Sequence, residues 1–355
     1  MRSLRALPRI GDRAGGRDNN FNLLRILAAV GVLISHAYPI SLGPEAAEPL
    51  SGLLGGITLG TVGVMVFFSI SGFFITRSFA GRSSLARFAQ ARCLRLFPAL
   101  IVVLLVTVLV SGLWLTTADP AVFWKAAPEY LLRNVSLFFL QYDLPGVFTV
   151  NVFGPAINGS LWTLNYEVLC YLGVVLVGLA GLLTRPWLFA LATVCFVAVY
   201  SFNEIHPLHV RIDSLLMLAL PFVIGMSFWV WRRVIPLSLL LAVALFGLAY
   251  LVHRTALLEP VLALALSYLM FVIGYAKIPV LAGYNRLGDY SYGTYVYAFP
   301  IQQLVASFGV ASPLVNIALA LPATLICAML SCHLVESPAM RLKSKSSAAV
   351  SPVKA

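Results

Sequence analysis

The chain has 355 residues, of which 60% are hydrophobic and only 10% are charged, and its formal net charge is +11. Soluble globular domains carry about 25% charged residues, so this composition excludes an ordinary soluble protein and indicates a polytopic membrane protein. The positive charge fits either nucleic-acid binding or the enrichment of Lys and Arg on the cytoplasmic side of membrane proteins, and the positions of the charges decide between them.

Ten segments are apolar and long enough to cross a bilayer, which takes about 20 residues. In chain order they cover residues 22–40, 57–78, 98–116, 160–183, 186–202, 213–231, 235–252, 258–275, 289–309 and 312–334. We therefore predict an all-α, polytopic integral membrane protein with about ten transmembrane helices. Residues 21–338 form the transmembrane domain, between a basic N-terminal arm (1–20) and a basic C-terminal tail (339–355). The arm and the tail have the polar composition of loosely ordered segments.

The lysines and arginines predict the orientation of these spans. If the N-terminus is cytoplasmic, four of the 24 Lys and Arg residues fall on the outer side: Lys125, Arg133, Arg211 and Arg254. This bias follows the positive-inside rule and puts both termini in the cytoplasm. The first span lacks a cleavage site, so we expect it to be retained rather than removed as a signal peptide. The charge therefore reports topology, and nucleic acid is not needed as a partner.

Two connections between the predicted spans are longer than the others. Residues 79–97 alternate basic and apolar side chains, which predicts an amphipathic helix on the cytoplasmic membrane surface. Residues 117–159 form an outer segment whose apolar part, 129–140, is too short to span, so we expect a re-entrant or interfacial element. The five cysteines show no metal-ligand spacing, and we predict free thiols and no metal.

Arg25 and His36 lie inside the first apolar segment, where a charged side chain near the bilayer centre costs about 2.5–3.5 kcal/mol. Their separation of 11 positions is three helical turns plus about 20°, so both lie on one helical face, about 16 Å apart. Arg25 falls near the cytoplasmic end and His36 in the outer half. The alternative is that Arg25 extends to lipid phosphates and His36 hydrogen-bonds a neighbouring carbonyl. For the pair on one face we favour a functional role.

Glu167 lies in the stretch GSLWTLNYEVLCYL (159–172), a few residues into the fourth predicted span and at about the depth of His36. A histidine and a carboxylate at matched depth can form a general base and the group that orients it. Alternatively, Glu167 hydrogen-bonds the aromatic side chains that gather at a membrane interface, here Trp162, Tyr166 and Tyr171. Spacing alone leaves both interpretations open.

Arg92 and Arg95 lie three residues apart in ARCLRLFP (91–98), on one helical face before Pro98. Two guanidiniums in this arrangement can clamp the phosphates of a nucleotide-bearing donor. Binding of anionic lipid is the alternative for any arginine cluster next to a membrane, and we favour it when the motif is considered by itself.

Six stretches together resemble motifs of the integral-membrane acyltransferase 3 family, in the family's order and over nearly the whole chain. They are RILAAVGVLISH in the first span, GVMVFFSISGFFI (63–75), RCLRLFP, GSLWTLNYEVLCY, LGDYSYGTYVYAFP (287–300) and HLVESP (333–338). The chain departs from the family pattern at Asn22 and Met65, where many members have an acidic residue, and at Ala298, where many have histidine. These departures favour His36 as the base.

The resemblance implies an O-acyltransferase that takes an acyl group, often acetyl, from cytoplasmic acetyl-CoA or another acyl-CoA. The acceptor is a hydroxyl of a surface or exported polysaccharide. His36 and Glu167 are the catalytic candidates, and Arg25, Arg92 and Arg95 are the candidates for binding CoA phosphates. The resemblance implies no metal. We expect as partners a carbohydrate acceptor, the lipid bilayer of a bacterial inner membrane, and machinery for polysaccharide biosynthesis or export.

Two features are compatible with more than one role. The stretch Ser69–Ser71–Gly72 can supply hydrogen bonds to a developing oxyanion, but helix–helix packing of small residues is the simpler explanation. A transporter or glycan exporter without acyl-transfer chemistry also contains buried His, Glu and Arg side chains. The combination of a cytoplasmic arginine motif with a buried histidine favours the acyltransferase, because a transporter needs no clamp for CoA phosphates.

Overall fold

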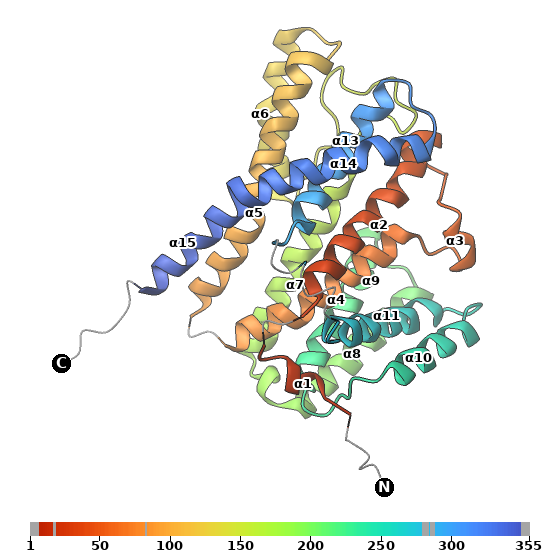
Figure 1. Ribbon diagram of the computed structural model, residues 1–355, viewed down its shortest axis with the longest axis vertical. Coiled ribbons are helices and arrows are strands. Elements are labelled where there is room, and N and C mark those ends of the chain that lie inside the picture. The colour runs from red at the N-terminus through yellow and green to blue at the C-terminus, as the bar shows by residue number, and fades with distance from the viewer. Residues whose placement is uncertain (1–6, 17–18, 82–83, 279–283, 285–287, 349–355) are drawn as a thin grey trace, which may run out of the picture.

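The computed structural model describes residues 7–16, 19–81, 84–278, 284 and 288–348, with side chains to residue 342, and the regular elements of this part of the chain are helices. Within these ranges there is no strand, and the one isolated β-bridge joins Arg9 to Pro236. The prediction of an all-α protein is confirmed. Figure 1 shows the helices gathered in one bundle, with α5 and α6 along its left side.

In chain order the helices are α1 (Ile10–Arg13), α2 (Phe21–Leu42), α3 (Leu50–Leu53), α4 (Leu59–Ala80), α5 (Leu85–Val110), α6 (Pro120–Ser136), α7 (Trp162–Leu179), α8 (Pro186–Ile205), α9 (Val210–Val230), α10 (Leu239–Leu251), α11 (Leu258–Gly274), α13 (Ser291–Ser307), α14 (Pro313–Ser331) and α15 (Ser337–Ala348). The π-helical segments η1 (Ser111–Leu115) and η5 (Cys332–Glu336) continue α5 and α14, and the short 3₁₀ helices η2 (Gly159–Leu161) and η3 (Leu182–Thr184) precede α7 and α8.

Seven helical segments within the described ranges are long and apolar enough to cross a membrane, and they contain α2, α4, α5, α7, α8, α9 and α14. The other three predicted spans, 235–252, 258–275 and 289–309, coincide with the shorter helices α10, α11 and α13, of 13, 17 and 17 residues. At 1.5 Å per residue, α10 extends only about 20 Å, whereas the hydrocarbon core is about 30 Å thick. The helices therefore fit a polytopic membrane protein, while ten crossings and cytoplasmic termini stay predictions.

The stretch 79–97 does not form the separate surface helix that its composition predicts. Helix α4 ends at Ala80, and α5 begins at Leu85 and continues past Pro98 as one helix. The basic and apolar alternation is thus the first half of a long helix. Its buried residues, among them Phe88 and Ala91, give that half a packed face rather than a membrane-surface face.

The described part of the N-terminal arm is packed against the body, contrary to the loose order that we expected. Ile10 is fully buried, and its backbone N–H donates a hydrogen bond to the carbonyl of Ile235 at 3.0 Å. The N–H of Leu237 donates to the carbonyl of Pro8 at 2.7 Å.

At the C-terminal end, the backbone of the tail is helical to Ala348 in α15. In the outer segment 117–159, the apolar piece at 129–140 is not an element of its own. Helix α6 begins before it, at Pro120, and ends within it, at Ser136.

Helix α4 lies at the centre of the bundle and packs against α2, α7, α9 and α11. Glycines set its approach to α9: a Cβ on Gly72 would come 2.0 Å from the carbonyl oxygen of Phe222, and a Cβ on Gly225 would come 2.0 Å from that of Ser69. Small residues permit such close helix crossings in membranes, where lipid removes most of the hydrophobic drive for helices to associate. Packing is therefore the role of Gly72.

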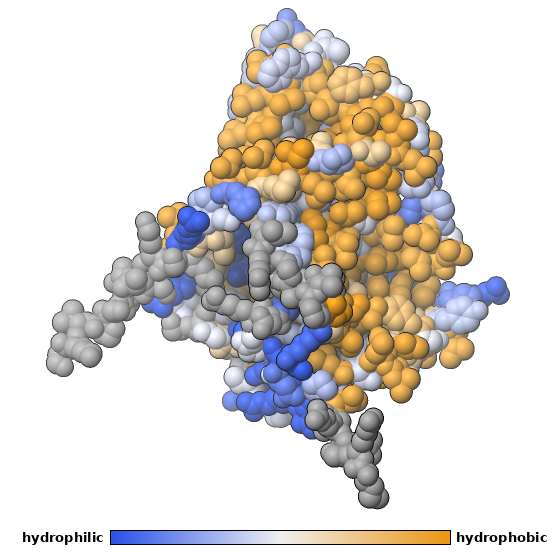
Figure 2. All heavy atoms as spheres, viewed as in Figure 1, coloured by the Kyte–Doolittle hydropathy of each residue, from blue (hydrophilic) through white to orange (hydrophobic). Residues whose placement is uncertain are grey.

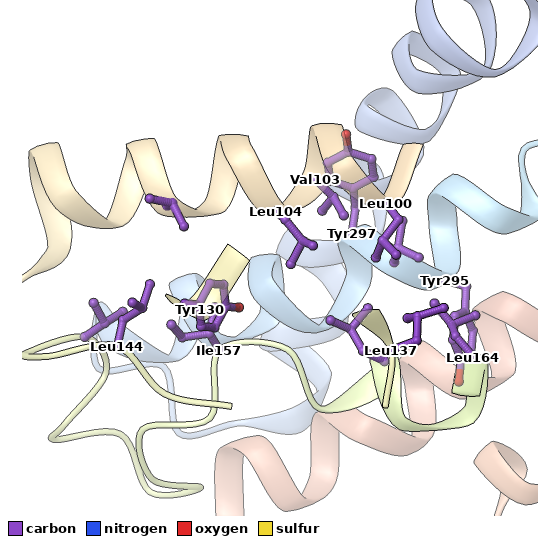
Figure 3. Packing of buried hydrophobic residues seen from close by; sticks show 14 of the residues in the cluster. Leu100, Val103, Leu104, Tyr130, Leu137, Leu144, Ile157, Leu164, Tyr295 and Tyr297 are labelled. Atoms are coloured by element: carbon purple, nitrogen blue, oxygen red, sulfur yellow. The ribbon is translucent and has the colours of Figure 1, made fainter. Parts of the chain in front are cut away.

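A cluster of buried apolar residues holds α5 against α6, α7 and α13 (Figure 3). Leu100 and Leu104 of α5 belong to it together with Tyr130 of α6, Leu164 of α7 and Tyr295 of α13. In a membrane bundle such side chains stabilise the arrangement mainly through the van der Waals contacts of close packing. The cluster fixes α5 relative to α7 and α13, and so it positions the arginines that precede Leu100 on α5.

The surface in Figure 2 is covered by hydrophobic residues over most of its upper part, and hydrophilic residues gather at the lower end, near α1. Large apolar side chains such as Leu113, Leu176 and Leu240 are exposed on the helices. An apolar helical surface of this extent is typical of contact with lipid.

Candidate active site

A cavity of about 260 Å³ lies among α2, α4, α5, α7 and α13, and Arg25, Arg92, Arg95 and Glu167 all line it. The structure thus brings together four of the five side chains selected from the sequence. We call it the inner cavity, because its arginines lie near the helix ends that the charge pattern assigns to the cytoplasm.

Arg25 and Arg95 converge on Asp289, which lies just before α13. Arg25 Nη1 is 3.1 Å and Arg95 Nη2 is 2.5 Å from the same oxygen, Asp289 Oδ2. Arg95 Nη1 is also 3.0 Å from Oε2 of Glu336, whose side chain is only 3% exposed. Counted together with Arg92 and Glu167, which line the same cavity, the group contains three guanidiniums and three carboxylates and is neutral by formal charge. The two arginines are therefore held in defined orientations by the protein itself.

Glu167 faces this arginine group. Its Oε1 accepts hydrogen bonds from Ser71 Oγ at 3.4 Å and from the Tyr171 hydroxyl at 2.5 Å. Ser71 Oγ in turn accepts one from Arg25 Nη2 at 3.4 Å. The contacts link α2, α4 and α7 across the cavity, so Glu167 helps to fix the polar groups that line it.

His36 lines a second cavity of about 190 Å³, together with Thr58, Thr61 and Trp162. We call it the outer cavity. The imidazole packs edge-to-face on Phe299, with 5.4 Å between ring centroids. Its Nδ1 is buried and has no hydrogen-bond partner among the described residues. Packing thus holds the ring, while this nitrogen has no group to donate to or accept from in the described part of the chain.

A buried carboxylate, Glu48, lies in the connection between α2 and α4, beside the helical turn that carries His36. It is 2% exposed, and its oxygens accept hydrogen bonds from Ser35 Oγ at 3.0 Å and from the backbone N–H of Leu59. Ser35 also lines the outer cavity. These bonds tie the end of α2 to the start of α4 and stabilise the wall of the outer cavity.

The two cavities share three lining residues: Val64 of α4, Thr163 of α7 and Tyr295 of α13. On α7, Trp162 lines only the outer cavity and Glu167 only the inner one, and on α13 Tyr292 lines only the inner cavity. On α4, Thr61 lines only the outer cavity and Ser71 only the inner one. The cavities therefore lie one above the other along the bundle, with a common wall.

Of the two interpretations that spacing left open for Glu167, the geometry favours hydrogen bonding to an aromatic side chain over pairing with His36. The two side chains line different cavities, and Glu167 bonds Ser71 and Tyr171 instead. Equal distance from the membrane surface gives only one coordinate of a side chain. Thr163 already stands in the shared wall, and Glu167, one helical turn further along α7, falls on its inner side.

Several residues of these cavities were not selected from the sequence. Asp289 and Tyr295 lie within LGDYSYGTYVYAFP, so the motif was noticed but no role was assigned to either side chain. Glu48 carries no such signal, because it lies in a short connection outside the predicted spans. Within the described ranges, no group of three or more His, Cys, Asp or Glu side chains could hold a metal ion.

Comparison with known proteins gives matches over nearly the whole chain. The family model for the acyltransferase domain of the acyltransferase 3 family matches residues 18–333. The chain is 28% identical to an O-acetyl transferase of Shigella phage Sf6 over 303 residues, which is 81% of this chain and 86% of the relative. It is 28% identical to nodulation protein 10 of Rhizobium leguminosarum bv. viciae in a match that covers 94% of this chain and 96% of the relative.

A third relative is the exopolysaccharide production protein ExoZ of Rhizobium meliloti (strain 1021), with 30% identity over 305 residues, or 78% of this chain and 86% of the relative. No solved structure matches the chain. The family match includes all of the outer cavity and, of the inner cavity, every lining residue from Arg25 in α2 to Tyr295 in α13. The chain therefore belongs to the acyltransferase 3 family.

Proposed function

We propose that the protein transfers an acyl group, in the first instance acetyl, from a cytoplasmic acyl-CoA to a hydroxyl of a surface or exported glycan. The observation that carries this proposal is the pair of cavities with a common wall. Arginines gather in one cavity, and a histidine with an unengaged ring nitrogen lines the other. This arrangement supports a donor and an acceptor that enter from opposite sides of the membrane and meet inside the bundle.

The inner cavity suits the donor. Its three arginines can form charge-assisted hydrogen bonds to CoA phosphates. Apolar side chains, among them Phe67 and Phe74, line much of the remaining surface and suit the pantetheine arm and a short acyl chain. Because Asp289 and Glu336 already orient two of the guanidiniums, less side-chain entropy is lost when phosphate binds.

The outer cavity suits the acceptor, with His36 as the general base. The acceptor oxygen attacks the thioester carbonyl carbon while His36 takes the hydroxyl proton. A C–O bond forms, the C–S bond breaks as the tetrahedral intermediate collapses, and the departing thiolate recovers the proton from the imidazolium. Such proton transfer contributes typically about 10²–10⁴ in rate. In this proposal Glu167 orders the inner cavity and does not orient His36.

The names of the relatives support the acyl group and the acceptor class. One is an O-acetyl transferase and another an exopolysaccharide production protein. Together with the apolar helices, they support an acetyl donor, a carbohydrate acceptor and a multi-pass protein of a bacterial inner membrane that works with polysaccharide biosynthesis or export.

The test uses membranes of the source bacterium from which the gene has been deleted, with and without the restored protein. Membranes are incubated with acetyl-CoA labelled in the acetyl group, and alkali-labile label is counted in the glycan fraction. We expect ester label only where the protein is present, and a loss of about 10²–10⁴ in His36→Gln, because glutamine cannot accept a proton at neutral pH.

His253→Gln is the matched control, since this exposed histidine at the end of α10 lines neither cavity and bonds the carbonyl of Tyr250. Its activity should equal that of the wild type. A wild-type protein that places no label in glycan, with changed glycan export instead, would show that the protein is a transporter and overturn the proposal.

A further inference from the structure

The wall shared by the two cavities contains one hydrogen-bonded pair of side chains. Thr163 Oγ1 lies 2.6 Å from the Tyr295 hydroxyl, and the two residues are 3% and 7% exposed. The third wall residue, Val64, has no polar side-chain atom. A thioester carbonyl that reaches the wall from the inner cavity therefore meets two hydroxyl groups and a valine.

The two hydroxyls differ in what they can donate. Thr163 Oγ1 has a second neighbour, the carbonyl oxygen of Ser160 at 3.4 Å, which can only accept. While that carbonyl takes the one Thr163 proton, Tyr295 donates to Thr163 Oγ1. The 3.4 Å contact is weak and easily given up, so the Thr163 proton can turn to the Tyr295 oxygen at 2.6 Å and release the phenolic proton toward a cavity. The Tyr295 ring is held edge-to-face by Phe67, with 5.7 Å between ring centroids. The wall thus holds a phenol in a fixed position, and a phenol is a stronger donor than an aliphatic hydroxyl.

Other hydroxyls near the cavities are placed less well for this task. Ser71 lines only the inner cavity and already bonds Arg25 and Glu167. Thr58 and Thr61 line only the outer cavity, and their hydroxyls lie 3.1 Å from each other. A group in the shared wall borders both cavities, so it can contact the carbonyl oxygen of a donor that reaches from the inner cavity toward an acceptor in the outer one.

We propose that Tyr295 is a catalytic residue whose hydroxyl donates a hydrogen bond to the oxyanion formed from the thioester carbonyl, with Thr163 as its positioning partner. This inference rests on the proposed function. When the acceptor oxygen bonds to the carbonyl carbon, the C=O π pair moves onto the carbonyl oxygen, which becomes negative. Tyr295 stabilises that oxygen and keeps its own proton. When the C–S bond breaks, the pair returns and the ester carbonyl forms.

The test compares Tyr295→Phe with Thr163→Val in the labelled acetyl-CoA assay. Both variants delete the same hydrogen bond, but only Tyr295→Phe removes the phenolic donor. We expect Tyr295→Phe to lower kcat by about 10²–10³ with an unchanged KM for acetyl-CoA, as for loss of one oxyanion donor. Thr163→Val should lower kcat only about tenfold or less, and Thr163→Ser should restore the wild-type value.

Tyr268→Phe is the structural control, because this buried tyrosine on α11 donates to the carbonyl of Pro236 at 2.7 Å and lines neither cavity. It should cost stability without a change in kcat. Equal losses in Tyr295→Phe and Thr163→Val, or a kcat of Tyr295→Phe within threefold of the wild type, would reduce the pair to a structural contact. A wild type without transfer refutes the proposed function itself, whereas an active wild type with an active Tyr295→Phe refutes this inference alone.

Discussion

Arg95 joins two parts of the chain that are distant in sequence from it: its guanidinium is 2.5 Å from Asp289 Oδ2 and 3.0 Å from Glu336 Oε2. Glu336 is almost completely buried, so removal of Arg95 leaves a buried carboxylate without its counter-charge. Removing one partner of a buried ion pair costs about 3–5 kcal/mol. Arg95 therefore has both a structural role and a proposed donor-binding role, and the two can be measured separately.

We expect Arg92→Ala and Arg95→Ala each to weaken acetyl-CoA binding by about 10–100-fold, because a hydrogen bond to a charged group contributes about 1.5–3 kcal/mol. Arg95→Ala should in addition lower the thermal stability, whereas Arg95→Lys should restore most of the stability and only part of the binding, because lysine lacks the bidentate fork. Calorimetric titration and thermal unfolding in detergent check this. Undiminished binding in the double Ala variant would leave Arg95 with its structural role alone and would favour lipid binding for Arg92.

The separation of His36 from Glu167 predicts how their variants combine. Because the side chains line different cavities, the fold-losses in transfer rate of His36→Gln and Glu167→Gln should multiply in the double variant. Glu167→Gln should be the milder change, since glutamine keeps an oxygen that accepts from Ser71 and Tyr171. Single-turnover rates of the wild type, the two single variants and the double variant show whether the losses multiply. A double variant no slower than His36→Gln alone would instead indicate that His36 and Glu167 act together as a catalytic pair.

The predicted topology is open to cysteine labelling from outside the cell. The natural cysteines are first replaced by serine, since Cys93 and Cys195 are exposed. A single cysteine at Asp143, an exposed position of the outer segment, should react with an impermeant maleimide, and one at Arg87 should react only after the membrane is opened. The reverse pattern would exchange the proposed donor and acceptor sides.

The crossing of α4 and α9 predicts a stability effect remote from the chemistry. Gly72→Ala places a methyl group against the backbone of Phe222, so we expect a loss of about 1–3 kcal/mol from overpacking and a lower unfolding temperature. Gly173→Ala is the matched control, because a Cβ there meets nothing within 4 Å. It should be neutral or slightly stabilising, as alanine favours helix over glycine. Equal unfolding temperatures for the two variants would mean that the crossing relaxes without cost.

The sequence by itself determined the features that depend on local pattern. Apolar segments marked the helices, since each of the ten predicted spans coincides with a helix, and helical spacing placed Arg25 and His36 on one face of α2. Order and spacing of motifs also identified the family. Composition was a weaker guide at the chain ends, where burial of Ile10 overrides the polar character of the arm. It also failed at residues 79–97, where α5 continues through Pro98.

Only the tertiary structure decided which side chains meet. A residue's depth follows from its position along a helix, but its neighbours depend on the rotation and tilt of every helix around it, and each step of one residue turns a side chain by about 100°. Glu167 therefore meets Ser71 and the arginines instead of His36. For the same reason the shared wall of Val64, Thr163 and Tyr295, built from three helices far apart in the chain, follows from packing and not from any motif.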